Sequence, residues 1–327
     1  MLYTFNQIPT LRTRVPKNVV EAMLNTGVQM NDGLKKTWPT SIDENPTVCG
    51  IRSFSSVIET NSKGELKTEE GLVFMEKDGD VVIAFGRMVY SNMGPTPVKY
   101  TIPVVDVDNK EMINESPVIE EQTLPFPCVE SLFQWLKACC HLDLEESMAD
   151  DVAVKIYGAK TPVDVQKAGR LMKGFVASRW VPIAAEVLEA CILAALEDEA
   201  TFHRYVGALN TMIKMLQVAS VKGFLLIEAN TDPNYGNNRD PHETLRSIQE
   251  HMAANPELNL IEAANQVNAS ETKAGKSGGK NLLGAMLTKI LTEFQHKSHA
   301  EFLAAVRPAE ENPAKRVCHG RSLTCPN

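Results

Sequence analysis

The chain has 327 residues, a formal net charge of −8 at pH 7 and a pI near 5.5, with 43% hydrophobic and 23% charged residues. This composition is ordinary for a globular protein and excludes wholesale disorder. The acidic balance also excludes a broad basic face for duplex DNA, although a few basic side chains and helix N-termini can still converge on one nucleotide.

The N-terminal quarter of the chain has a mixed pattern. A short helix is expected from Asn18 to Leu24, after Pro16, and the stretch from Asn31 to Thr68 is rich in turn-forming residues, which predicts turns and short strands. Apolar runs then predict three strands, the first two joined by an Asp-Gly turn: residues 71–79, 81–86 and 98–107. We therefore expect an N-terminal extension of mixed or irregular structure over residues 1–80.

From residue 129 onward, apolar residues recur at the helical period. One expected helix begins with Thr161 as its N-cap and Pro162 at its first position. The expected helices are 129–140, 162–173, 182–196, 202–219, 241–253, 260–267 and 281–294, with one short strand or buried extended segment at 225–227. The sequence thus predicts a mainly α fold with a small β element near its N-terminal side.

The helical domain is expected to span residues 81–300 and to contain an insertion. Residues 237–277 are polar and carry two of the expected helices; the sequence leaves open whether they form a lid or a partner-binding arm. Residues 301–327 contain three prolines and are expected to form a mobile tail.

The seven cysteines form no regular framework and include no Cys-x-x-Cys pair, which is typical of a reducing compartment. Cys318, His319 and Cys325 are too loose a set of ligands to predict a metal site, so we assign no metal and no cofactor. The N-terminus lacks the apolar run of a signal peptide, and no stretch approaches the ~20 apolar residues that span a bilayer. We expect a soluble, cytoplasmic protein (in the host cytoplasm if the gene is viral) with no membrane partner.

The first pattern that suggests chemistry lies on the helix at 129–140. At about 100° per residue, Glu130, Gln134 and Lys137 share one face, and His141 falls on the same stripe. A carboxylate and an amine on one face suit acid–base or nucleophilic catalysis. The same pattern is also typical of a solvated helix face.

A second pattern joins Gly169 and Arg170 within a helix and continues to Trp180. Glycine is unfavourable inside a helix, which indicates close packing at that position. Arginine suits forked contacts with phosphate or carboxylate. A surface arginine beside a packing glycine is the alternative.

Two further patterns lie in loops. A turn after the strand at 225–227 presents Asp232, Tyr235 and Gly236, either for substrate or simply as a capped turn. A Gly-rich loop leads through Lys280 and Asn281 into the last predicted helix, where free backbone N–H groups can bind an anion. It is not a P-loop, and a flexible linker is the alternative.

The order of these segments is informative. They are Ser91-Asn92-Met93, Pro-x-Val-Glu130-x-x-Phe-Gln134-x-x-Lys137, Thr-Pro followed by Gly169-Arg170 and Trp180, Asp232-x-x-Tyr235-Gly236, and Gly-Lys280-Asn281-x-Leu-Gly. Over about residues 83–294 this order resembles the NADAR family of N-glycosidases. That family includes enzymes acting on riboflavin-pathway intermediates and enzymes that remove ADP-ribose from guanine bases.

The resemblance implies a YbiA-like multihelical fold and hydrolysis of the C1′–N bond of a phosphorylated ribosyl or ADP-ribosyl substrate. It implies roles for Glu130 as the acid/base and for Lys137 as the amine nucleophile or electrophilic partner. The expected substrate contacts are Asn92, Gln134, Arg170, Trp180, Asp232, Tyr235, Gly236, Lys280 and Asn281. Among these, Arg170 and the backbone around Lys280 and Asn281 would contact phosphate.

The chain also departs from the family pattern. About ten extra residues precede Ile156, Tyr235 stands where Trp is usual, Ala195-Leu196 replaces a Lys-Phe pair, and about forty residues separate the Tyr-Gly turn from the Gly-Lys-Asn loop. These differences leave the substrate open, and the acidic composition favours a small molecule or free nucleotide over long nucleic acid. They also leave open a catalytically inactive protein that binds a nucleotide or ADP-ribose, or serves as a structural protein, on the same fold.

Overall fold

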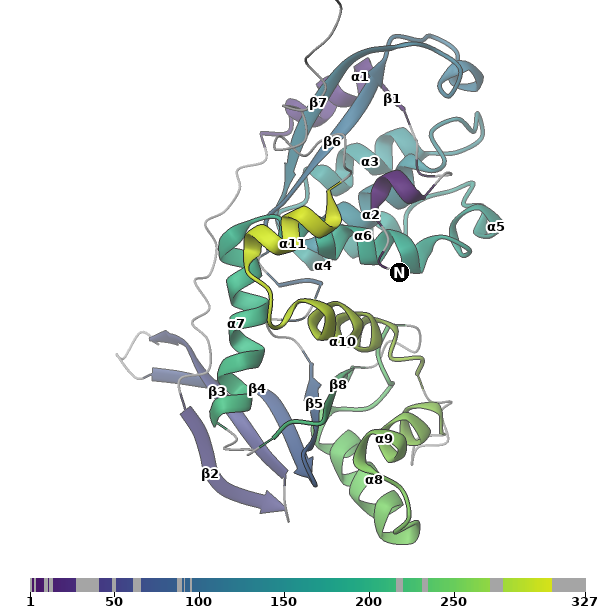
Figure 1. The fold of residues 1–327 in the computed structure, drawn as a ribbon. Coiled ribbons are helices and arrows are strands. Elements are labelled where there is room, and N and C mark those ends of the chain that lie inside the picture. Colours follow the sequence, from purple (N-terminus) through teal and green to yellow (C-terminus); the bar gives the residue numbers. More distant parts are fainter. Residues whose placement is uncertain are drawn as a thin grey trace, which may run out of the picture.

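The computed structural model describes residues 2, 4–8, 11, 14–27, 41–48, 51–60, 66–86, 90, 92–94, 96–215, 220–230, 235–270 and 279–307. These residues form a mixed α/β protein with one three-stranded and one five-stranded sheet (Figure 1). The prediction of a mainly α, YbiA-like multihelical fold is therefore wrong. The error arose because most strand residues lie in polar or turn-rich segments.

The three-stranded sheet has the order β1-β6-β7. β1 (Val15–Pro16) lies parallel to β6 (Val98–Val105), which pairs antiparallel with β7 (Val118–Phe126). The expected strand at 98–107 is confirmed, but β7 was not predicted. Its first six residues are exposed or half-buried and only Leu124 and Phe126 are buried, so the segment lacks the alternation of a half-buried strand.

The five-stranded sheet has the order β2-β3-β4-β5-β8. Four strands form an antiparallel meander, and β8 joins β5 in parallel; their bounds are Ser41–Val48, Ile51–Thr60, Leu66–Lys77, Asp80–Phe85 and Gly223–Glu228. The predicted Asp-Gly turn is confirmed, since Asp78 and Gly79 have positive φ angles of 55° and 92°. Residue 80, where we expected the N-terminal extension to end, is the first residue of β5.

The helices follow the predicted pattern with four differences. Helix α3 was not predicted, α4 ends at Gly169 rather than at residue 173, α5 is a separate turn of helix, and α11 occupies the start of the expected tail. The helices are α1 Lys17–Leu24, α2 Val129–Cys139, α3 Ala149–Tyr157, α4 Pro162–Gly169, α5 Ala177–Trp180, α6 Ala184–Leu196, α7 Glu199–Met215, α8 Pro241–Ala254, α9 Leu260–Ala269, α10 Leu282–Phe294 and α11 His299–Val306, with 3-10 turns at Phe5–Gln7 and Lys110–Met112.

Helix starts agree with the capping chemistry of the sequence. Thr161 accepts a hydrogen bond from the backbone N–H of Asp164 at 3.2 Å, and Pro162 occupies the first turn of α4, as predicted. Within the described residues, no helix is long and apolar enough to cross a membrane.

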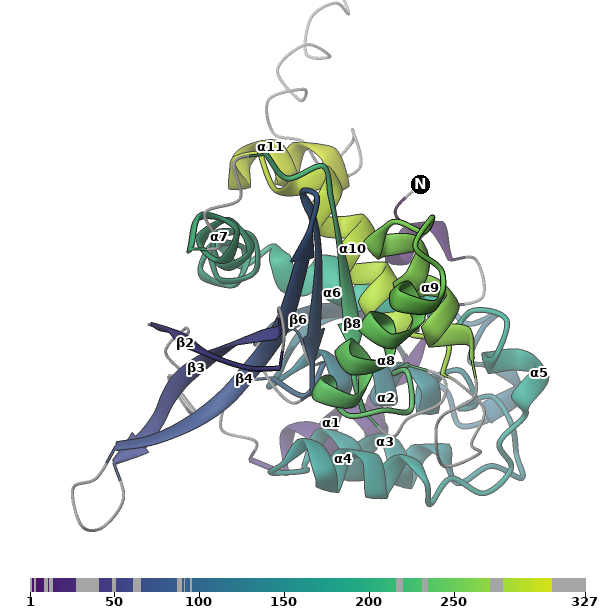
Figure 2. The ribbon, with the colours of Figure 1, turned by 90° about the horizontal axis from the view of Figure 1, so that it is seen from below.

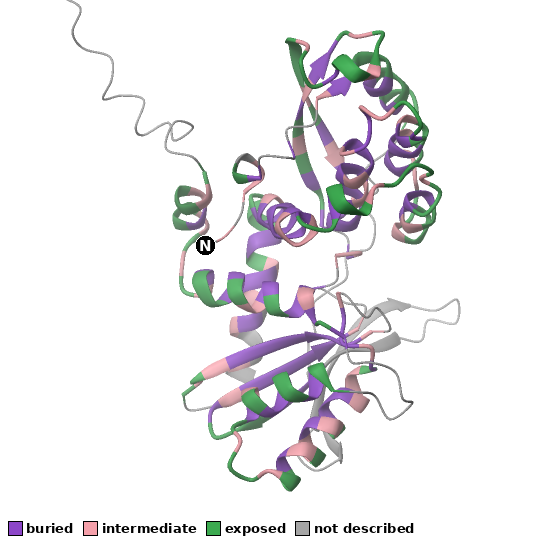
Figure 3. Ribbon diagram, turned by 90° about the vertical axis from the view of Figure 1, so that its right-hand side faces the viewer, coloured by how far each residue is buried: buried purple, intermediate pink, exposed green. Residues whose placement is uncertain are grey.

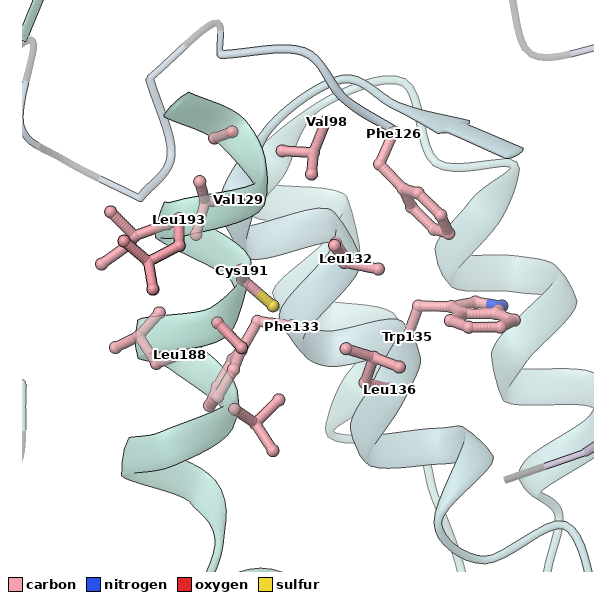
Figure 4. Close-up of a cluster of buried hydrophobic side chains, with 14 of the residues drawn as sticks. Val98, Phe126, Val129, Leu132, Phe133, Trp135, Leu136, Leu188, Cys191 and Leu193 are labelled. Carbon is pink, nitrogen blue, oxygen red and sulfur yellow. The ribbon is translucent and has the colours of Figure 1, made fainter. Parts of the chain in front are cut away.

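Helix α2 lies at the centre of the main hydrophobic core. Trp135 and Leu132 are fully buried, and Figure 4 shows α2 side chains facing Leu188, Cys191 and Leu193 of α6. Burying a side chain as large as Trp135 stabilises the fold by about 3–5 kcal/mol relative to alanine. The N-terminal segment belongs to the same core through its own buried residues, Ile8, Leu11, Val15, Val19, Val20 and Met23.

A second core lies on the other face of the five-stranded sheet. Because side chains alternate along β5, Val81, Ile83 and Phe85 point into the main core while Val82 and Ala84 point into the second one. Helices α8 and α9 cover this second face (Figure 2), and both β5 and β8 are buried almost throughout (Figure 3). The described part of the 237–277 insertion thus forms a packed layer of the fold.

The outer edge of β8 is covered by α10. Asn281 accepts a hydrogen bond from the N–H of Glu228 (2.9 Å) and donates one to the carbonyl of Leu226 (3.1 Å), and Thr288 Oγ1 accepts one from the N–H of Leu226 (2.9 Å). Gly284 permits this approach, because a Cβ there would collide with the Leu226 carbonyl oxygen. These side chains satisfy backbone groups that an uncovered edge strand would expose.

We expect Asn281→Ala to lower the free energy of unfolding by about 2–4 kcal/mol, measured by urea denaturation. The substitution removes both side-chain bonds to β8 and places alanine at φ 46°, in the left-handed region. Asn281→Gly is the matched control, because it removes the same bonds but tolerates the backbone angle, so its loss should be about 1 kcal/mol smaller. Equal stability of Asn281→Ala and the unmodified protein would contradict this account.

Candidate active site

The site centres on Glu130, which lies in the first turn of α2 and is only 2% exposed. Its Oε2 accepts a hydrogen bond from Asn92 Nδ2 at 2.5 Å, and its Oε1 accepts from Gln134 Nε2 at 3.0 Å and from Gln166 Nε2 at 3.2 Å. Its backbone N–H donates to the Asn92 carbonyl at 2.8 Å. Three amide N–H groups therefore point at the two oxygens of one buried carboxyl group.

Close packing between α2 and α4 makes this arrangement possible. A Cβ on Gly169 would lie 2.6 Å from Gln134 Oε1, so a larger residue would displace the amide that binds Glu130. The prediction that Gly169 marks a close contact is confirmed. Gln166 was missed, although it stands three residues before Gly169 and therefore shares its helix face.

Lys137 lies two helical turns beyond Glu130 and is half-buried. Its Nζ sits over the Phe175 ring, 4.8 Å from the centroid. Partial burial lowers the pKa of Lys137 from its ordinary value; Glu130 opposes this effect and Arg170 adds to it. A lowered pKa increases the fraction of neutral, nucleophilic amine at neutral pH.

The aromatic side chains connect α2 to two other segments. Trp180 of α5 is buried, and the centroid of its ring system lies 5.1 Å from that of Phe133 on α2. Tyr235, which follows β8, contacts the same Phe133, with ring centroids 5.8 Å apart. Tyr235 is half-buried, so part of the residue is exposed to solvent. This row brings the predicted Tyr-Gly turn to the helix that carries Glu130.

The end of the Gly-rich loop that the structure describes, from Gly279 onward, has a structural role. The N–H groups of Gly279, Asn281 and Leu283 donate to the carbonyls of Asn237, Gly236 and Tyr235, respectively. A Cβ on Gly236 would collide with the Asn230 side chain, so a larger residue there would displace Asn230. These three N–H groups are therefore used inside the protein, whereas Lys280 and, at the end of α4, Arg170 are exposed.

The predicted residues thus divide into three sets. Asn92, Gln134 and Lys137 surround or flank Glu130, with Arg170 close enough to influence the pKa of Lys137. Trp180 and Tyr235 contact α2 through Phe133. Gly236 and Asn281 hold the neighbouring turn and strand, and Asp232 lies outside the described residues.

Other parts of the molecule bear on the choice of site. A cavity of about 240 Å³ is lined by none of the predicted site residues; its lining is Leu2, Thr4, Gln7, Glu293, Phe294, Ala305 and Val306. Among the described residues no group of three or more His, Cys, Asp or Glu side chains could hold a metal ion. The tail residues Cys318, His319 and Cys325 lie outside that part of the chain.

Helix α2 carries a carboxyl group, on Glu130, and an amine, on Lys137, on one face. Glu130 is suited to stabilise a positively charged centre or to accept a proton, and Lys137 to attack a carbonyl or sugar carbon. Searches against protein-family models and curated proteins return no match. The likeness of the motifs to the NADAR family therefore stays an expectation drawn from the sequence.

We expect reductive methylation of Lys137 with formaldehyde and cyanoborohydride, followed across pH by peptide mass spectrometry, to give a midpoint below 10.5. Arg170→Ala should raise that midpoint, because it removes a positive charge that disfavours the ammonium. Arg307→Ala is the control, since Arg307 pairs with Glu197 at 3.4 Å, away from Lys137 and Phe175, and should leave the midpoint unchanged. A midpoint at 10.5 or above would contradict the pKa assignment.

Proposed function

We propose that this chain is an N-glycosidase that hydrolyses the C1′–N bond of a phosphorylated ribosyl or ADP-ribosyl substrate. The supporting observation is the buried carboxylate of Glu130 two turns from the amine of Lys137, whose pKa is lowered by burial. A titratable group with a perturbed pKa, such as Lys137, is frequent in active sites. The order of motifs that resembles the NADAR family supports the same reaction class.

Glu130 supplies the negative charge in the proposed reaction. As the C1′–N bond breaks, C1′ gains positive charge, which a nearby carboxylate stabilises. The three amide donors hold the carboxylate in place, so little reorganisation is needed when the charge develops. The same carboxylate can take the proton of an attacking water molecule.

Lys137 offers a covalent route to the same products. Its neutral amine forms a bond to C1′ while the bond from C1′ to the base nitrogen breaks, and the base leaves with a proton. The sugar ring of this adduct then opens: the C1′–O4′ bond breaks, the proton on the lysine nitrogen passes to O4′, and C1′ becomes a Schiff base with Lys137. Water adds to C1′ of the Schiff base and releases the sugar, which restores the amine. Seven residues of helix separate the two Cα atoms by ~10.5 Å, so both long side chains must lean toward a sugar between them.

The remaining contacts define the substrate. The exposed Arg170 and Lys280 are the proposed phosphate contacts, because guanidinium and ammonium groups bind phosphate oxygens. The accessible part of Tyr235 is suited to stack on a base or contact the ribose. We place the reaction in the cytoplasm, or in the host cytoplasm if the gene is viral.

We expect Glu130→Gln and Lys137→Ala each to reduce release of base from ADP-ribosylated guanosine or a ribosylamine phosphate by at least about a hundredfold, the lower range for loss of an acid–base group. Base release is measured by chromatography. Borohydride added during turnover should trap a sugar adduct on Lys137, seen by mass spectrometry.

Glu189→Gln is the matched control, because Glu189 is another buried carboxylate but binds Lys289 at 2.9 Å on the α6–α10 interface. It should keep turnover per folded molecule. Near-full activity of both site variants would refute the proposed roles. Ligand-induced stabilisation without any turnover would instead indicate an inactive binding protein.

We expect binding of an ADP-ribosylated oligonucleotide to weaken only slightly with salt, because the chain carries a net charge of −8. Each phosphate contact contributes a slope of about −0.7 to −0.9 in log K against log [salt]. A slope near −1 to −2 would fit contacts to the ADP-ribose alone. A much steeper slope would show that the strand itself is bound.

A further inference from the structure

His141 lies directly beyond the end of α2 and is fully buried. Its Nδ1 lies 2.9 Å from the carbonyl oxygen of Lys137, and its Nε2 accepts a hydrogen bond from the N–H of Val176 at 3.1 Å. Because the Lys137 carbonyl can only accept, Nδ1 carries the proton and Nε2 is left to accept from Val176. One imidazole therefore joins the end of α2 to the segment that precedes α5.

This link fixes Phe175, whose ring lies against the amine of Lys137 while 39% of the residue is exposed. Phe175 precedes Val176; its ring lies 5.2 Å from the His141 ring and 4.8 Å below Nζ of Lys137. The chain enters this segment through Gly174, with a φ of 73°, and the Lys173 carbonyl accepts a hydrogen bond from the N–H of Met148 at 3.3 Å. The position of Phe175 is thus set by His141 on one side and by the 146–148 loop on the other.

We propose that His141 is a positioning residue, which holds the Phe175–Val176 segment against α2 and so keeps the amine of Lys137 partly out of water. The consequence for base release rests on the proposed function, whereas the consequence for the amine itself does not. A carboxylate or ammonium at this position would not reproduce the bond pattern, since the site needs one donor and one acceptor.

The charged groups around this link are few among the described residues. Glu130 and Arg170 act on the amine of Lys137 in opposite directions. Near His141, Asp143 of the following loop pairs with Arg179 of α5 at 2.7 Å, and Arg179 also donates to the Cys140 carbonyl at 3.4 Å. The Asp143–Arg179 pair joins the same two segments from outside, so loss of the imidazole should loosen Phe175 without detaching α5.

The test compares His141→Leu, which keeps an apolar side chain but loses both bonds, with His141→Gln, whose amide can both donate and accept. Lys137 is titrated by reductive methylation in the free protein. We expect His141→Leu to move its midpoint up toward the ordinary 10.5, and His141→Gln to restore most of the shift. His299→Leu is the matched control, since His299 also bonds a helix-end carbonyl, that of Leu196 at 3.2 Å, away from Lys137.

The pH dependence of kcat is a second readout, which would not change if His141 only stabilised the fold. Each unit of rise in the Lys137 pKa lowers the neutral amine fraction about tenfold at neutral pH. We expect His141→Leu to reduce kcat at pH 7 in proportion to the measured rise of the Lys137 midpoint, with little change in KM, and the deficit to shrink as pH rises. His299→Leu should stay within about twofold of the unmodified protein at every pH.

A Lys137 titration that is the same in His141→Leu, or a rate loss that is equal at all pH values, would overturn the proposal. If His141→Leu does not fold, Val176→Pro removes the same bond from the other side and must produce the same upward shift. A shifted titration with no turnover in any variant would retain the role of His141 and refute the glycosidase. Normal turnover with an unshifted titration would refute the role of His141 and retain the glycosidase.

Discussion

A buried carboxylate is the constraint on which the candidate site depends. An ionised group that is almost entirely removed from water destabilises a fold by several kcal/mol unless hydrogen bonds replace its hydration. Glu130 receives that replacement from Asn92 after β5, from Gln134 on α2 and from Gln166 on α4. Three segments distant in sequence must therefore be placed correctly before the site can exist.

The same requirement explains the packing around α2. Gly169 allows α4 to approach closely enough for Gln134 and Gln166 to reach one oxygen atom. The loop that carries Asn92 follows β5, a strand buried on both faces between two cores. The layer formed by α8 and α9 thus supports the site indirectly, by completing the sheet from which that loop departs.

Helix α10 serves the second side of the site. Its N-cap Asn281 and its residue Thr288 bind the outer edge of β8, and the N–H groups of Gly279, Asn281 and Leu283 pair with the backbone at 235–237. This pairing holds Tyr235 against Phe133. The segment that resembles an anion-binding loop in sequence therefore stabilises the fold through its backbone N–H groups. In this segment, the exposed side chain of Lys280 is available to contact a ligand.

The sequence by itself determined the local elements. Apolar periodicity and capping residues predicted α2, α4, α6, α8, α9 and α10, and the Asp-Gly turn predicted the β4–β5 hairpin. The sequence also placed Glu130, Gln134 and Lys137 on one helix face, because that relation depends only on the helical repeat. It failed for the fold class, since exposed strands such as β7 and polar strands such as β2 lack a period that distinguishes them from loops.

Tertiary structure alone decided the environment of each side chain. Whether Glu130 faces water or three amides depends on contacts with residues 92 and 166, which lie 38 and 36 positions away. Contacts between distant segments also bring Gln166 to Glu130 and the Phe175 ring to Lys137. The same is true of the hydrogen bonds of His141. Burial and hydrogen bonding between distant segments are not local properties of a chain, so no periodicity within one helix can reveal them.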